Sequence, residues 1–459
     1  MRIVLLSGGS GKRLWPLSNE IRSKLFLKLL PSEDGGKESM LQRICRQLDE
    51  AGLLPLASIV AHESQAELTQ HQVGDRIAFL AEPYRRGTFT AAALAASYLH
   101  AERLAAADET ICVMPADLFV EAGFFRLLRE FPGILARSGA ELALLGTTPA
   151  HPSSQYGYIV PQPPDASGGE AKDYRPVARF VEKPGEADAL VLMKQQALWN
   201  CGVFAFPLHV MLAHLRRKGL PAEYESLLAC YERLPEASFD VEIAEKTRRC
   251  VVIPYDRGWR DLGDWRVLTE YLGSSIVGRG EISGDSLHTH VVNELDSPVH
   301  VIGLSNVIVA ASPDGILVAD KDGANRIKQQ LPGGGKPASG EKRWGSYRLL
   351  DHAKTGMGTE ALTKKIAMLP GKNTSYHRHR KRDETWTVLS GTGEFILETV
   401  HARIQAGDVL SIPAGAKHAV KAITPLVYID IQLGTELLEE DSERFAIAWE
   451  EILRLCGSR

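Results

Sequence analysis

The N-terminal segment constrains the fold more strongly than any other part of the chain. A short apolar run, residues 2–6, leads directly into the glycine-rich segment 7–11. Because glycine has no Cβ, such a turn lets several backbone N–H groups approach one anion. Lys12 and Arg13 place positive charge directly after the turn. The segment therefore predicts a strand of an α/β sheet that ends in a phosphate-binding turn, with a plain strand-to-helix turn as the alternative.

This turn differs from two well-known phosphate-binding signatures. A P-loop has its glycines further apart and continues with Lys and then Ser or Thr, whereas here Lys12 is followed by Arg13. A dinucleotide fingerprint has a third glycine at the position that Leu14 occupies. The sequence therefore indicates a phosphate site of another kind.

Composition and length indicate an ordinary globular protein of two or three domains. The chain has 459 residues, of which 44% are hydrophobic and 24% charged, and it is too long for one hydrophobic core. Its formal net charge of -4 argues against a broad nucleic-acid surface. The cysteines are scattered with no CxxC pair, and no apolar run is long enough to cross a membrane. We therefore expect a soluble, cytoplasmic protein with neither a nucleic-acid nor a membrane partner.

Three regions differ in their residue patterns. In residues 1–272, buried-looking strands alternate with amphipathic helices, which predicts an α/β domain with a mostly parallel sheet. Residues 273–330 hold short β-like runs divided by turn residues, and the Gly- and Pro-rich residues 331–343 form a predicted linker. Residues 344–459 show alternating strands with Pro-Gly turns, which predicts a compact β-barrel closed by a helix over about 439–455.

Two aspartates in the first region follow predicted strands. Asp117 comes at the end of the run 111–115, and Asp261 follows the aromatic-bounded segment 255–260. Open α/β sheets bind their ligands at the carboxyl ends of parallel strands. Two carboxylates that converge there would hold Mg²⁺ against a triphosphate. Taken singly, an aspartate at a strand end is more often a helix cap.

Seven motifs follow one another along residues 1–270. They are residues 8–18, with Trp15-Pro16-Leu17-Ser18, together with 24–27; 81–88; 115–117; 156–159; 180–184; 199–204; and 259–265. With these motifs the chain resembles the sugar-1-phosphate nucleotidyltransferases, and within them the mannose-1-phosphate guanylyltransferases. The resemblance implies a Rossmann-like nucleotidyltransferase domain that joins a sugar 1-phosphate, expected to be mannose 1-phosphate, to GTP and releases pyrophosphate.

The resemblance also implies roles for individual residues. Arg13 and Lys24 would stabilise charge on the α-phosphoryl group and on the leaving pyrophosphate. Asp117 and Asp261 would hold the Mg²⁺ cofactor, so that these four residues form the expected catalytic set. The residues expected to bind the nucleotide are Gly8, Gly9, Gly11, Arg13, Arg86 and Thr88, and those expected to bind the sugar are Gly157, Glu182 and Asn200.

Three positions depart from the family pattern. Leu25 stands where the family has Gln, Gly87 where it has Asn, and Leu118 where it has His. The charged residues are therefore kept, while residues that frame the base and the sugar change. A different sugar 1-phosphate or base is the first alternative, and a non-catalytic nucleotide-sugar-binding regulatory protein with a structural barrel is the second.

The C-terminal region carries two spaced groups of metal-ligating residues. Alternation along strands would turn His377, His379 and Glu384 into the barrel, where His418 from a facing strand would join them. Four N and O donors suit Zn²⁺, Fe²⁺, Mn²⁺ or Ni²⁺, and the sequence does not choose among these transition metals. Surface histidines beside a basic turn are the alternative.

The spacing of these four residues, and of the glycines at 371, 391, 407 and 415 around them, resembles the two motifs of the cupin superfamily. Further matches to the phosphomannose isomerase domain that is fused to guanylyltransferases are residues 344–347, 384–386, 390–392, Gln432, Gly434, Glu439, Asp441 and Arg444. The resemblance implies a bifunctional enzyme in which Arg444 would serve a mannose-6-phosphate isomerase. However, His377 replaces the family's Gln, and Arg380 and Lys381 replace two histidines, so a structural or dimerising barrel is the alternative. We also expect a homo-oligomer, namely a dimer.

Overall fold

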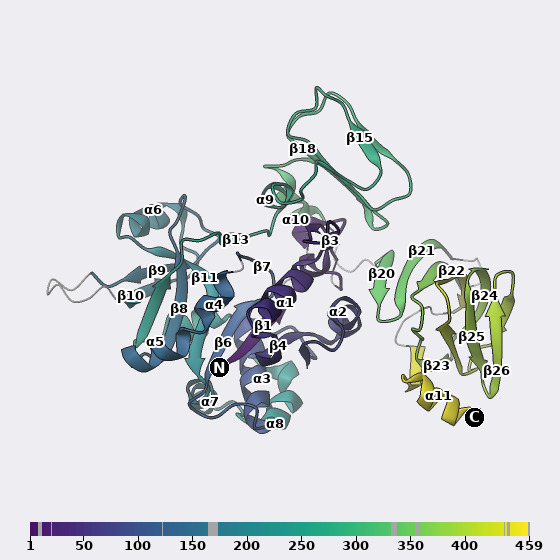
Figure 1. The fold of residues 1–459 in the computed structure, drawn as a ribbon, viewed down its shortest axis with the longest axis horizontal. Coiled ribbons are helices and arrows are strands. Elements are labelled where there is room, and N and C mark those ends of the chain that lie inside the picture. The colour runs from purple at the N-terminus through teal and green to yellow at the C-terminus, as the bar shows by residue number, and fades with distance from the viewer. Residues whose placement is uncertain are drawn as a thin grey trace. The chain divides into compact units, whose positions relative to one another are not determined.

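The computed structural model describes residues 1–7, 12–19, 21–121, 123–163, 173–331, 337–354, 358–435, 437 and 441–457 (Figure 1). Three predicted phosphate-turn residues, Gly8, Gly9 and Gly11, lie outside these described residues, as does Glu439 of the barrel motifs. Packing divides the chain into two compact units. The first holds Met1–Leu14 and Ser23–Gly273, and the second holds Trp15–Arg22 and Ser274–Arg459.

A nine-stranded sheet lies at the centre of the first unit, in the order β5-β4-β1-β6-β11-β8-β12-β10-β9. Parallel pairs join β5, β4, β1 and β6, and also β8 and β12, whereas β9, β10 and β11 pair antiparallel. The sheet is therefore mixed, and the prediction of a mostly parallel sheet is wrong in this respect, because strand direction depends on long-range pairing. Strand β1 is buried along its middle, which is why its sequence is an unbroken apolar run. The strands are β1 (Arg2–Ser7), β4 (Ala57–His62), β5 (Ala78–Glu82), β6 (Thr110–Pro115), β8 (Leu142–Thr147), β9 (Tyr158–Pro161), β10 (Arg175–Val181), β11 (Leu198–Pro207) and β12 (Cys250–Pro254).

Helices pack against this sheet. The alanine-rich helix α3 (Gly87–Ala101) contacts β1 and β4 and is buried along most of its length. Helix α1 (Met40–Glu50) begins with a capping box, in which Ser39 Oγ accepts from Gln42 N at 3.1 Å and Gln42 Oε1 accepts from Ser39 N at 3.0 Å. The other helices are α2 (Ala66–Val73), α4 (Gly123–Leu128), α5 (Phe131–Ser138), α6 (Glu186–Lys194), α7 (Leu208–Arg217), α8 (Tyr224–Ala229) and α9 (Trp265–Thr269).

Short elements hold three of the predicted site residues of the first unit: Arg13 lies in the 3₁₀ turn η1 (Lys12–Leu14), Lys24 in the 3₁₀ turn η2 (Lys24–Phe26) and Asp261 in strand β13 (Arg260–Asp261). Further short elements are the strands β2 (Leu30–Pro31), β3 (Lys37–Glu38) and β7 (Leu118–Phe119), and the π-helical turn η6 (Asp240–Ala244). Across the described ranges, every helix is too short or too polar to span a membrane.

The second unit begins with short strands that stack in parallel. Strand β14 pairs with β16 and β16 with β18, while β15 pairs with β17, and β19 returns antiparallel to β18. Their core is a column of valines, Val291, Val301 and Val309. We call this part the connecting region. Its strands are β14 (Ile276–Val277), β15 (Gly280–Ile282), β16 (His290–Asn293), β17 (Val299–Val301), β18 (Val307–Ser312) and β19 (Gly315–Asp320), and helix α10 (Ile327–Gln330) follows.

Two sheets form the C-terminal barrel, with strand orders β20-β21-β22-β29-β24-β27 and β26-β25-β28-β23-β30. Both sheets contribute to one core, which includes Trp386 from β24, Phe395 from β25 and Tyr428 from β29. The strands are β20 (Ser339–Lys342), β21 (Gly345–Lys354), β22 (Glu360–Met368), β23 (Tyr376–His379), β24 (Arg382–Ser390), β25 (Thr392–Leu397), β26 (Val400–Gln405), β27 (Val409–Ile412), β28 (His418–Ala422), β29 (Leu426–Gly434) and β30 (Ser442–Ala446), and helix α11 (Trp449–Leu455) follows.

Two predictions near the barrel need correction. The predicted helix over 439–455 is wrong in its first half, because Ser442–Ala446 pairs as strand β30 with β23, and α11 begins at Trp449. The predicted linker 331–343 contains strand β20, which pairs with β21. In both places an inter-strand ladder, which local sequence does not reveal, decides the structure.

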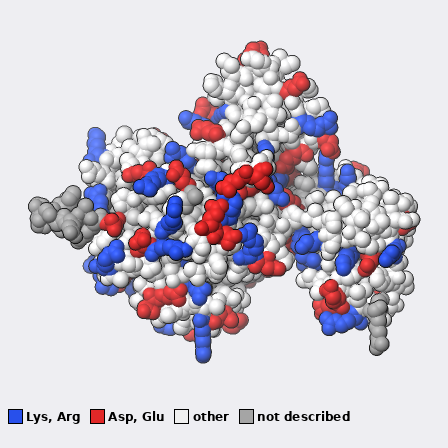
Figure 2. Space-filling view, in the orientation of Figure 1, with Lys and Arg blue, Asp and Glu red and all other residues white. Residues whose placement is uncertain are grey.

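Charge on the surface is mixed. On the face shown in Figure 2, Lys and Arg side chains alternate with Asp and Glu side chains over both units. This distribution agrees with the small formal net charge of -4.

Candidate active site and metal centre

A short ladder brings two predicted metal-binding carboxylates together. Strand β13 pairs antiparallel with β7, so that Asp261 lies opposite Leu118, the residue after Asp117. Lys24 Nζ lies 2.7 Å from Asp117 Oδ2 and 2.9 Å from Asp261 Oδ1. The structure therefore brings three of the four predicted catalytic residues into one cluster.

Lys24 is held in its charged form by these contacts. Burial alone would lower the pKa of its ammonium group, but the charges of Asp117 and Asp261 outweigh burial and raise the pKa above its ordinary value. The Lys24 ammonium group contacts both carboxylates at once, so the oxygens of Asp117 and Asp261 are close enough to bind one divalent cation together. The two aspartates therefore fit the Mg²⁺ that the family implies.

Arg13 lies on the exposed side of the same neighbourhood. Its Nη2 is 3.5 Å from Gln155 Oε1. Burial raises the pKa of Tyr156, the next residue, to about 12, with the charges of Asp261 and Asp264 acting in the same sense and those of Lys24 and Arg13 against it. Because these charges act on one phenol, Arg13 shares its surroundings with Asp261 and Lys24.

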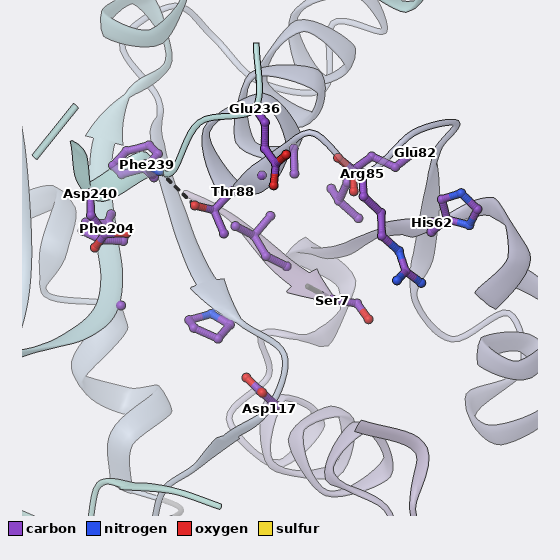
Figure 3. A pocket seen from close by; sticks show the side chains of 16 residues that line it. Ser7, His62, Glu82, Arg85, Thr88, Asp117, Phe204, Glu236, Phe239 and Asp240 are labelled. Atoms are coloured by element: carbon purple, nitrogen blue, oxygen red, sulfur yellow. Dashed lines mark hydrogen bonds between the residues drawn. The ribbon is translucent and has the colours of Figure 1, made fainter. Parts of the chain in front are cut away.

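A cavity of about 400 Å³ adjoins Asp117 (Figure 3). Thr88 lines it, and its Oγ1 accepts from Phe239 N at 2.9 Å. Arg86 turns away from it and donates to the carbonyl of Glu232, whereas its neighbour Arg85 lines the cavity. Other lining residues are Ser7, His62, Glu82, Gly87, Phe204, Glu236 and Asp240. The predicted nucleotide-binding residue Thr88 therefore lines the cavity beside Asp117, whereas Arg86 does not. Arg85, which the motifs did not single out, is the cation that lies there instead.

The structure explains why glycine occupies position 87, where the family has Asn. Its φ is +84°, and an added Cβ would lie 2.3 Å from the carbonyl oxygen of Ala237. Ala237 N donates to Arg86 O at 3.1 Å, and Phe89 N donates to Ala237 O at 3.1 Å. Backbone contact on both sides leaves no room for a side chain.

The predicted sugar-binding residues also meet. Asn200 N donates to Gly157 O at 2.8 Å, and a Cβ on Gly157 would lie 2.6 Å from Glu182 Oε2. Asn200 Nδ2 donates to Asp240 Oδ1 at 2.7 Å, and Asp240 lines the cavity. The structure thus brings Gly157, Glu182 and Asn200 into one group.

Asp240 is a site residue that the sequence reasoning missed. Burial, reinforced by the charge of Glu182, raises its pKa to about 6. It begins the π-helical turn η6, a rare conformation that often marks functional sites. The available signal was the alternation of Asp240 and Glu242 with apolar residues in the segment 239–244, but η6 follows no regular sequence period.

The barrel brings its four predicted metal donors together. His377 lies opposite His418 across β23 and β28, and potential ligand atoms of His377, His379 and His418 all lie within 4.8 Å of one another. Glu384 Oε1 is 3.3 Å from His379 Nε2, and Glu384 Oε2 is 3.5 Å from His418 Nε2. Three imidazoles therefore converge, and Glu384 contacts two of them, His379 and His418. Arg382 Nη2 also lies 3.1 Å from His379 Nε2.

The chemistry of these histidines fits a metal. Nδ1 of His377 is 2.7 Å from Ser375 O and Nδ1 of His418 is 3.1 Å from Ala416 O. Since a carbonyl can only accept, both rings carry their proton on Nδ1 and present a bare Nε2. Nε2 of His418 is buried and has no hydrogen-bond partner among the described residues. A buried lone pair that faces a carboxylate oxygen is explained by a cation between them.

Burial also favours the neutral forms of His377 and His379, as metal binding requires. It is the largest cause that lowers the pKa of His377, to about 3, and the neighbouring His418 and His379 lower it further. Burial likewise lowers the pKa of His379 to about 4, where Glu384 opposes and Arg382 assists.

Partners of Glu384 behind the donor set were not predicted. Trp386 Nε1 donates to Glu384 Oε2 at 3.2 Å and to Asp430 Oδ1 at 3.1 Å, and Gln432 Nε2 contacts both carboxylates as well. Arg382 Nε donates to Glu384 Oε1 at 3.3 Å. Burial, followed by the charge of Glu384, raises the pKa of Asp430 well above its ordinary value. This network fixes the orientation of Glu384.

Strand β30 carries Arg444 and also the acidic partner of two of the basic residues in 378–382. Arg444 lies opposite His377 in the ladder and is exposed. The guanidinium groups of Arg378 and Arg380 each contact Glu443 Oε2 at 2.8 Å. The basic cluster is therefore at least partly neutralised by an acidic residue of the same sheet.

Two family models match this chain, one in each of its main regions. Residues 2–273 match the family model Nucleotidyl transferase, and residues 338–446 match Mannose-6-phosphate isomerase C-terminal. The chain belongs to the nucleotidyl transferase family. This nucleotidyltransferase is 32% identical over 485 residues to the xanthan biosynthesis protein XanB of Xanthomonas campestris pv. campestris, a match that covers 96% of this chain and 97% of that protein.

Two further relatives have informative names. A putative mannose-1-phosphate guanylyltransferase of Vibrio cholerae is 30% identical, with 96% of this chain and 98% of that protein covered. A solved structure from Thermus thermophilus, titled mannose-1-phosphate geranyltransferase, has a TM-score of 0.58 and 29% identity and covers 72% of this chain and 97% of that one. The resemblance drawn from the motifs is confirmed, as is the predicted α/β domain followed by a cupin barrel.

Proposed function

We propose that this nucleotidyltransferase transfers a guanylyl group from GTP to mannose 1-phosphate, giving GDP-mannose and pyrophosphate. The observation that carries the proposal is the contact of Lys24 with both Asp117 and Asp261 beside a cavity lined by Thr88 and Asp240. The choice of sugar is supported by the names of the relatives from Vibrio cholerae and Thermus thermophilus, and the choice of base by the name of the Vibrio cholerae relative.

The reaction needs no nucleophile from the protein. A phosphate oxygen of the sugar 1-phosphate attacks the α-phosphorus of GTP, and the bond from the α-phosphorus to the bridging oxygen breaks, so that pyrophosphate leaves with the electron pair. Lys24 and Arg13 supply positive charge where negative charge develops. A bound Mg²⁺, held by Asp117 and Asp261, would neutralise phosphate charge.

The group around Gly157 would bind the sugar. Glu182 and Asp240 offer carboxylate acceptors for hydroxyl groups, and the absent side chain of Gly157 lets Glu182 Oε2 lie close to the backbone. Asn200 Oδ1 accepts from Gly202 N at 3.0 Å, and its Nδ2 donates to Asp240, so its amide has one defined orientation. Fixed donors and acceptors of this kind discriminate between sugars that differ in one hydroxyl group.

The test is a matrix of substrates. Purified protein is incubated with each of GTP, ATP, CTP, UTP and dTTP against mannose, glucose and heptose 1-phosphates, and pyrophosphate release is measured. We expect the highest kcat/KM for GTP with mannose 1-phosphate. A clear preference for UTP or dTTP, or for another sugar, would overturn the assignment, whereas absence of release with every pair would favour a regulatory protein.

For the barrel we propose a mannose-6-phosphate isomerase that uses a divalent transition metal. The observation behind it is the convergence of three imidazoles and Glu384 in the C-terminal isomerase domain. A metal held there would bind the oxygens of the sugar, while a base moves the proton between adjacent carbons. Elemental analysis for Zn, Fe, Mn and Ni, followed by assay of fructose 6-phosphate formation, tests it. A metal-loaded barrel without conversion would favour a structural role.

A further inference from the structure

The segment Trp15–Arg22 connects two residues of the transfer site but packs elsewhere. In the sequence it lies between Arg13 and Lys24, whereas in the structure it belongs to the second unit, together with the connecting region. Each end of the segment is therefore two positions from a cation of the transfer site.

Two hydrogen bonds tie the middle of this segment to the turn between β18 and β19. Ser312 Oγ donates to Pro16 O at 2.7 Å, and Asn19 Nδ2 donates to Asp314 Oδ2 at 3.0 Å. Ser312 is buried, with 4% of its surface exposed. The same Asp314 accepts from Ala338 N through Oδ1 at 2.6 Å, so its carboxylate is held on both oxygens.

Arg22 makes the strongest of these contacts. Its Nη1 and Nη2 each lie 2.8 Å from one carboxylate oxygen of Glu294, a paired geometry that stabilises more than a single contact does. The side chains of Arg22 and Glu294 are 16% and 28% exposed, so solvent screens the pair only in part. Asn19 Oδ1 accepts from Arg22 N at 2.8 Å, which fixes the backbone that carries the guanidinium.

A glycine of the connecting region lies against Trp15, the first residue of the segment. Gly315, at the start of β19, has a φ of +148°, and an added Cβ would lie 2.6 Å from Trp15 Cζ2. The indole of Trp15 therefore lies directly on the backbone of the connecting region, and a side chain at this position would displace it.

We propose that the connecting region is a positioning part of the transfer site: through Glu294, Asp314 and Gly315 it fixes Trp15–Arg22, and so sets where Arg13 and Lys24 meet the triphosphate. None of the three anchoring residues needs to touch substrate. The role rests on the proposed transfer function, in which Arg13 and Lys24 act on phosphate charge. Misplacing such groups by about 1 Å can lower a rate by roughly 10²-fold, so loss of an anchor should reduce kcat measurably.

The variants are Glu294→Gln, Asp314→Asn and Gly315→Ala, with two matched controls in the same unit. Asp296→Asn removes an exposed pair, in which Arg348 Nη1 lies 3.1 Å from Asp296 Oδ2 and Asp296 is 92% exposed. Gly284→Ala adds a Cβ where nothing lies within 4 Å. For each protein, kcat and KM, the thermal midpoint and the affinity for inorganic tripolyphosphate are measured.

We expect each anchor variant to lower kcat about tenfold and to weaken tripolyphosphate binding severalfold, while both controls match the parent. Unchanged kcat and tripolyphosphate affinity in all anchor variants would overturn the proposal, as would equal losses in the controls.

The tripolyphosphate arm separates this proposal from the proposed function. Tripolyphosphate carries no base or sugar, so it tests Arg13 and Lys24 whatever substrates the enzyme accepts. If no substrate pair reacts, yet the anchor variants still bind tripolyphosphate more weakly than the controls, the proposed function fails and the positioning role stands. If the parent transfers guanylyl groups and the anchor variants differ only in thermal midpoint, the positioning role fails.

Discussion

The two candidate sites differ in how far they are built before a ligand arrives. In the transfer site, the side chains of Lys24, Asp117 and Asp261 keep 20%, 23% and 37% of their surface exposed and satisfy one another's charge. In the barrel, Glu384 and His418 keep only 3% and 1% and leave a lone pair without a hydrogen-bond partner among the described residues. The first site must exchange internal ion pairs for contacts with substrate, whereas the second is preorganised for a metal.

This difference predicts the largest effects at the transfer site. Asp117→Ala should abolish turnover at all practical Mg²⁺ concentrations, since it removes a metal ligand and a partner of Lys24. Lys24→Ala should lower kcat by roughly 10²–10³-fold, because its charge acts on the transition state. Steady-state kinetics of both variants test this, with Asp49→Ala, from an exposed ion pair of the same unit, as the control. Near-normal rates in both would remove these residues from the mechanism.

A double substitution in the barrel tests whether the two sites work separately. His379→Ala with Glu384→Ala should strip metal from the barrel and abolish conversion of mannose 6-phosphate to fructose 6-phosphate. Nucleotidyl transfer should stay within a few-fold of the parent, because the barrel donors and the transfer site have no residue in common. Metal analysis and both assays on one preparation decide it, with His401→Ala, whose partner is Glu394, as the control. Transfer that falls in parallel with metal content would show that the sites are coupled.

A smaller effect should appear at the sugar group. Gly157→Ala would place a Cβ 2.6 Å from Glu182 Oε2 and 2.9 Å from Phe180 Cζ. We expect the KM for the sugar 1-phosphate to rise roughly tenfold, with little change in the KM for GTP. Gly123→Ala, where the nearest atom is 4.0 Å away, is the control. An equal rise for both substrates would contradict the division of the site into sugar and nucleotide parts.

The smallest effect concerns pH. Since the fold raises the pKa of Asp240 from 3.8 to about 6, folding favours its protonated form, and that contribution to stability is lost as the pH rises through about 6. Asp240→Asn keeps an acceptor for Asn200 but cannot ionise. The melting temperature of the variant, relative to the parent, should therefore be higher at pH 7.5 than at pH 4.5. A difference that is independent of pH would show that Asp240 is not protonated by the fold.

The parts of the molecule that could be predicted are those in which particular residue types recur at a fixed spacing along strands or at strand ends. The four barrel donors follow from two strand patterns, and the carboxylates Asp117 and Asp261 from strand ends, because strand alternation and sheet topology are local or general rules. The alternation of strands and helices likewise predicts the α/β unit.

The parts that were missed depend on long-range pairing. Nothing local shows that β11 runs antiparallel into the sheet or that 442–446 pairs with β23. Asp240 meets Asn200 from 40 positions away, and Asp430 meets Trp386 from 44. Such contacts depend on which strands and turns become neighbours, and a single sequence does not reveal that.

The division of the chain into its two units also has a consequence for how such enzymes evolve. The N-terminal signature segment Trp15–Arg22 packs with residues that come almost 300 positions later, as in the contact of Asn19 with Asp314. Recombination that exchanged everything after residue 273 between relatives would separate this segment from the surface on which it lies. The two stretches should therefore be inherited together, and functional chimaeras should need residues 15–22 from the same parent as the connecting region.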